Sequence, residues 1–150
     1  MGVTYLLDTH VLLWLWGDSG RLASGFVAEL ARPTNRLLVS AVSAMEVATK
    51  TRLGTLEPGR ALVPTWPARA TEIAAEELPI STAHALLAGS MQWDHRDPFD
   101  RLLVAQAITE GVPLVTVDAV MTQVPGLRVA DPGLTGLWKS PDVAVGPVDG

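Results

Sequence analysis

Hydrophobic residues fall into short runs rich in branched side chains, and these runs alternate with longer segments of helical spacing. The runs predict strands at residues 3–7, 37–39, 77–80, 113–117 and 127–130. The segments between them predict helices at residues 10–16, 24–31, 43–53, 64–75, 81–88 and 98–110. Gly54 and Gly111 are placed to end two of these helices. This alternation is typical of a parallel sheet covered on both faces, so we expect an α/β fold.

The length of 150 residues favours one domain, because it supports one substantial core and is short for two. We expect this domain to occupy residues 1–138. The remaining residues 139–150 contain Pro141, Pro147 and glycines without periodicity, so we expect an irregular C-terminal tail.

The composition restricts the chemistry to oxygen and imidazole ligands, because the chain has no cysteine and only three histidines. The abundant carboxylates favour hard cations such as Mg²⁺ or Mn²⁺. A net charge of −5 is the wrong sign for a protein that binds nucleic acid through a general basic surface. If the substrate is RNA, metal ions and local basic residues must offset this charge.

The apolar N-terminal residues 1–16 lack the basic start of a signal peptide and are interrupted by Asp8 and His10. No apolar stretch is long enough to cross a bilayer. We therefore expect a soluble, cytoplasmic protein with no membrane association.

Acidic residues stand at the ends of two predicted strands and early in two predicted helices. Asp8 follows the first strand and Asp118 follows the fourth, where either side chain alone is explained as a cap for the next turn. Glu46 lies three residues after Ser43, which fits an S-x-x-E capping box. Each of these acids alone therefore has a structural explanation.

The fourth acid, Asp100, lies near the positive end of a predicted helix. Asp97 is its rival for a functional role, but Pro98 directly after Asp97 favours Asp97 as the N-cap. In a parallel sheet, all four acids would lie along one edge, which is where α/β sheets bind ligands. If the fourth strand lies beside the first, the carboxylates converge and require a cation to offset their repulsion.

Four segments of the chain, taken in order, resemble the PIN-domain proteins and specifically the VapC-type toxins of toxin-antitoxin systems. The segments are Leu6-Leu7-Asp8-Thr9-His10 with Leu12-Leu13-Trp14, Ser40-Ala41-Val42-Ser43 with Glu46-Val47-Ala48, His95 to Ala107, and Leu114-Val115-Thr116-Val117-Asp118. The resemblance implies a three-layer α/β/α fold with a five-stranded parallel sheet in the order 3-2-1-4-5. It also implies an Mg²⁺- or Mn²⁺-dependent endoribonuclease that is inhibited by a VapB-like antitoxin and forms a homodimer.

The resemblance implies that the four acids form the catalytic site. We expect Asp8 and Asp100 to bind metal directly, Asp118 to bind a second ion or a bound water, and Glu46 to orient the nucleophile. Thr9 and Thr116 match hydroxyl positions near the family's site. Four residues are therefore candidates for contact with substrate: Thr9, Thr116, Arg96 and Arg101. For the two arginines, a solvated helix end is an equally good explanation.

Several nearby residues have two explanations on the sequence alone. Lys50 lies one helical turn after Glu46, so an intrahelical ion pair explains it as well as RNA contact does. Trp14 and Trp16 are typical of base stacking, but also of a core or a dimer interface, and we expect them with Leu53 to support homodimerisation.

The rival functions include two phosphate-handling folds of similar organisation. A dehalogenase-type phosphatase needs a second Asp where this chain has His10, and a response-regulator receiver needs a phosphoacceptor Asp where Ser81 follows Ile80. The remaining alternative is a catalytically idle PIN-like module that acts only by binding partners. The intact set of acids argues against it, because unused carboxylates would only repel one another.

Overall fold

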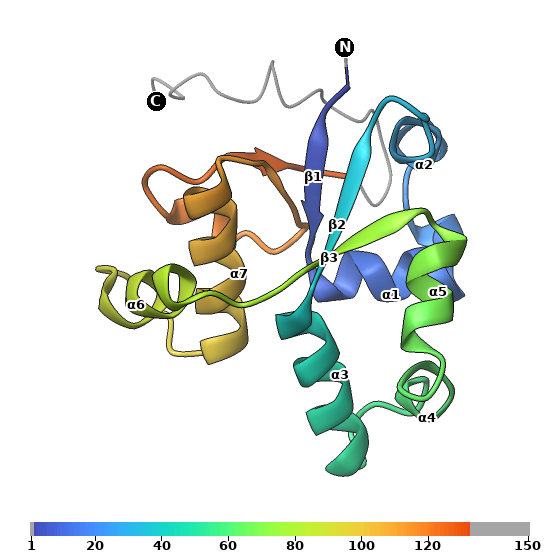
Figure 1. Ribbon diagram of the computed structural model, residues 1–150, viewed down its shortest axis with the longest axis horizontal. Helices are drawn as coiled ribbons and strands as arrows, with labels where there is room; N and C mark the ends of the chain where they lie inside the picture. The colour runs from blue at the N-terminus through green and yellow to red at the C-terminus, as the bar shows by residue number, and fades with distance from the viewer. Residues whose placement is uncertain (1, 133–150) are drawn as a thin grey trace.

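The computed structural model describes residues 2–132 and shows a five-stranded sheet between two layers of helices (Figure 1). All pairs of neighbouring strands are parallel, and the strand order is β3-β2-β1-β4-β5, which confirms the three-layer α/β/α fold. The strands are β1 (Thr4–Leu7), β2 (Arg36–Ser40), β3 (Ala75–Leu78), β4 (Leu114–Val115) and β5 (Val129–Ala130). The predicted C-terminal tail lies outside the described residues.

Seven α-helices and two short 3₁₀ helices connect these strands in the described part of the chain. They are α1 (Thr9–Gly17), η1 (Ser19–Arg21), α2 (Ser24–Leu30), α3 (Ala41–Arg52), α4 (Gly59–Leu62), α5 (Trp66–Glu72), α6 (Thr82–Ser90), α7 (Pro98–Glu110) and η2 (Met121–Gln123). Among residues 2–132, no helix is both long and apolar enough to cross a membrane.

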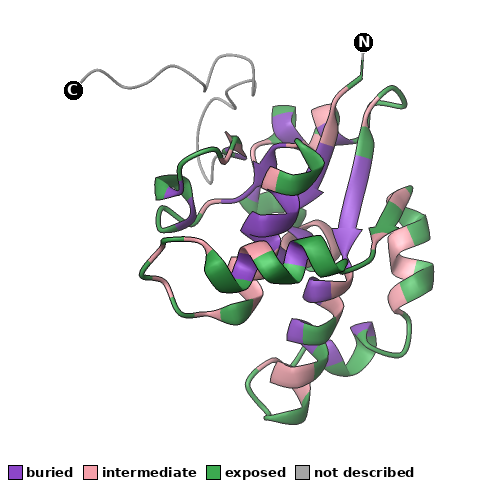
Figure 2. Cartoon of the chain, turned by 60° about the vertical axis from the view of Figure 1, so that its left-hand side comes forward, coloured by how far each residue is buried: buried purple, intermediate pink, exposed green. Residues whose placement is uncertain are grey.

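The alternating side chains of the central strands divide the core into two halves. Tyr5 and Leu7 of β1 point into a cluster with α1 and α2, whereas Leu6 points into a cluster with α3 and α7. Figure 2 shows buried residues in the central strands and exposed residues on the outer helices. Burial on both faces explains why the central strands are continuous apolar runs.

The start of α3 differs from the prediction. Ser40 ends β2 and also caps α3, because its hydroxyl accepts a hydrogen bond from the Val42 amide at 2.9 Å. The predicted capping box at Ser43 and Glu46 is therefore wrong. Ser43 instead lies inside the helix, where its hydroxyl contacts that of Thr9 at 2.8 Å. The carboxylate of Glu46 is not needed as a cap.

The segment before β3 also differs from the prediction of a helix to residue 75 and a strand at 77–80. The helix α5 ends at Glu72, and Ala74 adopts a left-handed conformation with φ of 53° that turns the chain into β3. Glu76 pairs with Arg36 of the neighbouring strand at 2.7 Å, and the strand ends before Pro79, which has no amide to donate.

The helix α7 has the predicted bounds of Pro98 and Glu110. Asp97 caps it by accepting hydrogen bonds from the amides of Phe99 (2.8 Å) and Asp100 (3.3 Å), as predicted. Gly111 ends it with φ of 67°, a conformation that favours glycine. The first turn of α7 is thus held at the carboxyl edge of the sheet.

Candidate functional site

A cavity of about 220 Å³ lies at the carboxyl edge of the sheet, between α1, α3 and α7. We call it the acid pocket, because five carboxylates line it: Asp8, Glu46, Asp97, Asp100 and Asp118. The structure thus brings together the four acids selected from the sequence, together with Asp97. Within the described residues, Lys50 is the only lysine or arginine that lines it.

Asp8 lies at the centre of this arrangement, directly after β1. It occupies the N-cap position of α1 but its side chain makes no capping hydrogen bond. Its Oδ2 instead accepts a hydrogen bond of 2.7 Å from the hydroxyl of Thr116. Burial raises the pKa of Asp8 from 3.8 to about 6, and the nearby charge of Asp100 adds to the rise, while the Thr116 hydrogen bond opposes it. The ionised form of Asp8 is therefore costly unless a cation approaches.

Thr116 connects the ends of the two central strands and is almost completely buried. Its hydroxyl donates to Asp8 and accepts a hydrogen bond of 3.0 Å from the Asp118 amide. Both hydrogen bonds of this hydroxyl are made within the fold, which favours a positioning role for Thr116, and its contact with substrate stays a prediction.

Asp118 lies at the exposed rim of the acid pocket. Its Oδ1 accepts a hydrogen bond of 3.0 Å from the Val120 amide, so it also stabilises the turn after β4. The cap predicted from the sequence is therefore present, and Oδ2 of Asp118 makes no hydrogen bond within residues 2–132.

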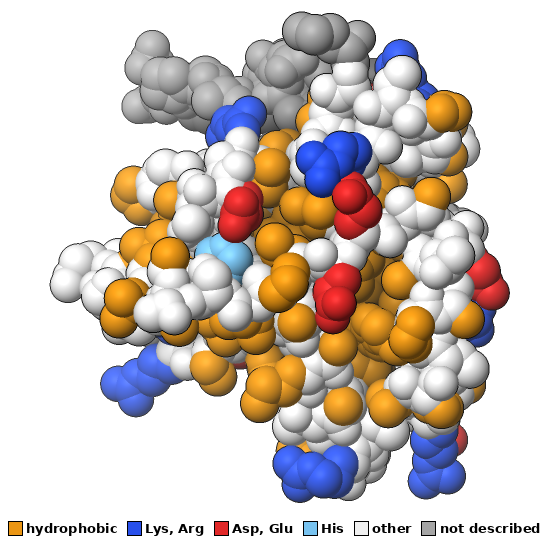
Figure 3. Space-filling view, in the orientation of Figure 1, with side chains coloured by type: hydrophobic (Ala, Val, Ile, Leu, Met, Phe, Trp, Pro, Cys, Tyr) orange, Lys and Arg blue, Asp and Glu red, His pale blue; other side chains and the backbone are white. Residues whose placement is uncertain are grey.

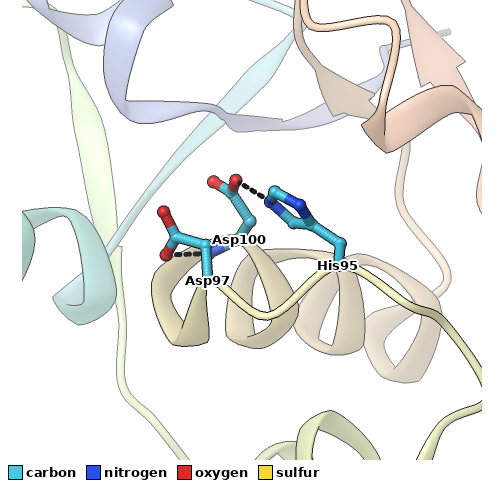
Figure 4. A group of neighbouring side chains, drawn as sticks. All are labelled: His95, Asp97 and Asp100. Atoms are coloured by element: carbon cyan, nitrogen blue, oxygen red, sulfur yellow. Dashed lines mark hydrogen bonds and ion pairs between the residues drawn. The ribbon is translucent and has the colours of Figure 1, made fainter.

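Asp100 is half-buried in the first turn of α7, and His95 approaches it from the preceding loop (Figure 4). The Nε2 atom of His95 lies 2.6 Å from Oδ2 of Asp100. Burial raises the pKa of Asp100, and the negative charges of Asp97 and Glu46 add to the rise, whereas His95 opposes it. The side chains of His95, Asp97 and Asp100 lie close enough together to share one metal ion.

Sequence reasoning did not assign His95 a role, although His95 stands five residues before Asp100 in the motif used for the resemblance. The loop that carries it has no hydrophobic periodicity that would predict its path. Arg101 fixes that path, because its guanidinium donates to backbone carbonyls at 2.6–2.9 Å, namely those of Ala88, Met91, Trp93 and His95.

These hydrogen bonds also change the interpretation of Arg101. The guanidinium holds the loop before α7, so Arg101 has a structural role, and its contact with RNA stays a prediction. Arg96 is exposed and lines a separate shallow cavity, and it stays a predicted substrate contact. Thr9 lines the acid pocket, with its hydroxyl already bonded to Ser43.

Glu46 is buried on α3, and its Oε2 lies 2.5 Å from the Lys50 ammonium. The intrahelical ion pair, one of the two explanations open on the sequence, is therefore present. The pKa of Lys50 is raised, first by its hydrogen bond to Glu46 and further by the charges of Glu46, Asp97 and Asp100. One ammonium group thus faces several carboxylates, and the acid pocket keeps an excess of negative charge.

The oxygen-rich donor set and this uncompensated charge fit a hard divalent cation. Asp8 and Asp100 come from two different elements, and a bound divalent cation would offset the free energy that ionising these two carboxylates costs. Carboxylates with raised pKa values in one pocket are typical of a functional site, and here they indicate a candidate metal centre.

Solved structures with a similar fold include toxin-antitoxin complexes from three bacteria. VapBC2 from Rickettsia felis, bound to a DNA fragment from its promoter, has a TM-score of 0.58 at 17% identity, covering 83% of this chain and 96% of that one. A complex from Klebsiella pneumoniae has a TM-score of 0.55 at 19% identity, covering 86% and 98%. VapBC-1 from nontypeable Haemophilus influenzae has a TM-score of 0.54 at 16% identity, covering 81% and 91%.

No curated protein matches the sequence. The family model for the PIN domain matches residues 5–127, which include every acid of the pocket and all strands except β5 in whole or in part. The chain therefore belongs to the PIN domain family.

Proposed function

We propose that this protein is a VapC-like endoribonuclease toxin that hydrolyses RNA phosphodiester bonds with Mg²⁺ or Mn²⁺ and is neutralised by a cognate antitoxin. The observation that carries the proposal is the convergence of five carboxylates, faced by one lysine, on a pocket at the carboxyl edge of a PIN domain. The similar structures include a toxin-antitoxin complex, VapBC2 and VapBC-1, which supports the partner, and the PIN domain endonuclease Utp24, which supports the nuclease. The choice of RNA follows the VapC resemblance.

In this proposal, Asp8 and Asp100 would hold the ion directly, and Asp118 at the rim would hold a second ion or a water. A divalent ion bound here supplies charge neutralisation on the phosphate and a water made nucleophilic near neutral pH. Thr116 and His95 each contact one oxygen of a candidate ligand carboxylate, Thr116 that of Asp8 at 2.7 Å and His95 that of Asp100 at 2.6 Å. Such outer partners orient the ligands.

Glu46 would orient the attacking water, because its buried carboxylate does not serve as a helix cap. Lys50, held at Glu46, would meet the phosphate as it enters. In hydrolysis the water oxygen forms a new bond to phosphorus, one bridging P–O bond breaks, and the leaving oxygen receives a proton.

The test is to sequence RNA ends after brief expression of the wild-type chain and of Glu46→Gln. The matched control is Glu76→Gln, which changes an exposed carboxylate on β3 outside the acid pocket. We expect discrete new ends with wild type and with the control, and none with Glu46→Gln. New ends that persist in Glu46→Gln would contradict the role of Glu46, and no new ends with wild type would favour the idle interaction module.

The antitoxin should place a basic side chain among the carboxylates, because the pocket has an excess of negative charge on an already acidic chain. Expression together with the product of the neighbouring open reading frame should give a complex that lacks RNase activity. Failure to recover a complex, with cleavage unaffected by the neighbour, would contradict this part of the proposal. A toxin of this kind acts in the cytoplasm.

The homodimer stays part of the proposal, with a change in the residues that support it. Trp14 and Trp16 are half-buried against the core, so they contribute less exposed apolar surface than expected. Leu53, directly after α3, is 61% exposed, Met45 on α3 is 59% exposed and Leu86 on α6 is 68% exposed. Figure 3 shows hydrophobic side chains extending from α6 across β3 toward α5. Light scattering at micromolar concentration should give twice the 15.9 kDa mass of the chain.

A further inference from the structure

A second cavity, of about 560 Å³, adjoins the acid pocket between α1 on one side and α4 and α5 on the other. These three helices lie on the same side of the sheet in Figure 1. The two cavities share three lining residues: His10, Leu13 and Leu56. We call the second cavity the aromatic groove. A chain molecule that enters one cavity can therefore continue directly into the other.

Aromatic side chains form the wall of the groove nearest the acid pocket. The rings of His10 and Trp14 are close to parallel, with an interplanar angle of 26° and centroids 5.9 Å apart. His10 is exposed and Trp14 is half-buried. The two rings thus form a stacked pair at the junction of the two cavities, because His10 lines both cavities and Trp14 lines the groove.

Trp16 gives the groove a fixed wall. Its Nε1 donates a hydrogen bond of 3.2 Å to the backbone carbonyl of Arg69, and its ring meets Trp66 edge to face with centroids 4.9 Å apart. A wall held in this way offers apolar contact without a large loss of side-chain freedom on binding.

The charges of the groove differ from those of the acid pocket. Asp18 is the one carboxylate among its described lining residues, and two guanidinium groups accompany it, those of Arg21 and Arg69. The Arg21 guanidinium lies 5.9 Å from the Trp14 ring centroid and 3.1 Å from Asp18. The ion pairs that these arginines make are substantially exposed and therefore weak, so a phosphate can replace the carboxylate partner.

We propose that the aromatic groove binds the unpaired base of a nucleotide next to the scissile phosphate, with Trp14 as the stacking surface and Arg21 near the adjoining phosphate. The inference rests on the proposed function, because it needs RNA in the acid pocket. A phosphodiester in that pocket has a nucleotide on each side, and the shared residues lead one of them into the groove. Stacking on aromatic rings suits any base, but it requires the base to be unpaired. The proposal therefore requires an unpaired base beside the cut.

The experiment measures kcat and KM on a short RNA oligonucleotide that spans the mapped cut site. A series of oligonucleotides carries one abasic nucleotide at each position in turn. The proteins are wild type, Trp14→Phe, which keeps an aromatic face, and Trp14→Leu, which keeps apolar bulk without one. With wild type, one abasic position beside the cut should raise KM by about 5- to 150-fold and change kcat little, as expected for the loss of one stacked base.

The two variants then identify the side chain that stacks. Trp14→Leu should raise KM for the intact oligonucleotide by a similar factor. For the oligonucleotide with the sensitive abasic position, it should cause no further rise in KM. Trp14→Phe should have KM values near those of wild type. If Trp14→Leu does not fold, Arg21→Gln at an exposed position replaces it. It should raise KM for the intact oligonucleotide more than for the abasic one.

Three outcomes would overturn the proposal. In the first, wild type cleaves the RNA with no abasic position that raises KM, or the effects of the abasic nucleotide and of Trp14→Leu on KM simply multiply. Either result would contradict base binding in the groove but leave the proposed nuclease activity intact. Normal KM in Trp14→Leu with loss of antitoxin binding would assign the groove to a peptide of the partner. A folded wild type that cuts no RNA would remove the proposed function as well.

Discussion

The helix α7 contributes side chains to two polar clusters, the acid pocket at its first turn and a network around Gln106 further along. In the network, the Ser40 hydroxyl donates to Oε1 of Gln106 at 2.5 Å, and Nε2 of Gln106 donates to the Pro79 carbonyl at 3.2 Å. His84 accepts from the Ser81 amide at 2.9 Å, so its neutral ring carries the proton on the nitrogen that meets Glu110 at 2.8 Å.

Both clusters remove polar groups from water and give them hydrogen-bond partners, but only the acid pocket also brings several like charges together. Ser40, Gln106 and His84 are at most 2% exposed, and the side chain of each makes at least two hydrogen bonds within the fold. The acid pocket leaves buried carboxylates facing one another, and burial raises the pKa of Asp8 and of Asp100. The network therefore stabilises the fold and positions α7, whereas the acid pocket costs stability until a cation binds.

The largest expected effect is on cleavage by Asp8→Asn. The neutral amide keeps the size of the side chain and still accepts a hydrogen bond from Thr116, but it is a poor ligand for a hard cation. We expect the cleavage rate to fall by at least about 100-fold, since the loss of a direct ligand should exceed the loss of an outer one. Initial rates on the mapped oligonucleotide measure this. Asp131→Asn, outside the acid pocket, is the control.

The same substitution should separate activity from stability in chelator. The pKa of Asp8 is 3.8 ordinarily and about 6 in the fold, so between these values the folded state binds more protons than the unfolded state. The protonated form of Asp8 is therefore favoured by folding. Its contribution to the free energy of unfolding is fully present below pH 4, and it is lost as the buried carboxyl ionises when the pH rises through 6. The loss is about 3 kcal/mol.

Urea unfolding at several pH values checks this sign. Asp8→Asn should match wild type near pH 4 and become more stable by up to about 3 kcal/mol near pH 7. A variant that is less stable than wild type at pH 7 would show that the carboxylate is well solvated or paired, and the contrast with the network would fail.

Magnesium should reverse the cost in wild type. An ion that binds only the folded state adds about 2.7 kcal/mol at 100 times its dissociation constant, or roughly 5 to 10 °C in Tm for a domain of this size. Asp8→Asn should gain much less. Thermal melts of both proteins in chelator and in Mg²⁺ provide the comparison, and equal gains in Tm would place the ion elsewhere.

Breaking the network should have the opposite pattern. Gln106→Leu leaves the Ser40 hydroxyl and the Pro79 carbonyl without their partner, which should lower the free energy of unfolding by about 2 kcal/mol. Cleavage per folded molecule should fall less than in Asp8→Asn, because no carboxylate is lost. Gln123→Leu, at an exposed position, is the matched control. A Gln106→Leu protein as stable as its control would mean that the network contributes nothing.

The bounds of α7 could be predicted because local signals agree with the fold, whereas the strand order was available only from the resemblance to the PIN domain family. Asp97, Pro98 and Gly111 each favour the conformation that α7 needs at its ends. The start of α3 was placed two residues late, because the capping signal of Ser43 is as strong in sequence as that of Ser40. The edge strand β3 was misplaced, because its half-exposed residues lack the continuous apolar run of the central strands.

The acids of the pocket could be predicted because strand ends and helix starts are local features that a parallel sheet collects at one edge. The partners of these acids are set by tertiary contacts. Thr116 meets Asp8 from a position 108 residues away, and His95 reaches Asp100 only because Arg101 folds the loop between them. No periodicity in the sequence records either contact.

The smallest effect concerns the two acids in the first turn of α7, which the sequence left as rivals. Asp97→Ala removes the side chain that accepts from the Phe99 and Asp100 amides, so it should cost about 1 kcal/mol of unfolding free energy. Asp100→Asn should leave the protein in chelator as stable as wild type or more so, because it removes a half-buried charge that faces Asp97 and Glu46. Cleavage should respond in the reverse order, with the larger loss in Asp100→Asn. Urea unfolding and initial rates on both variants test the assignment. If Asp100→Asn retains activity while a stable Asp97→Ala loses it, then Asp97 is the metal ligand and Asp100 is not.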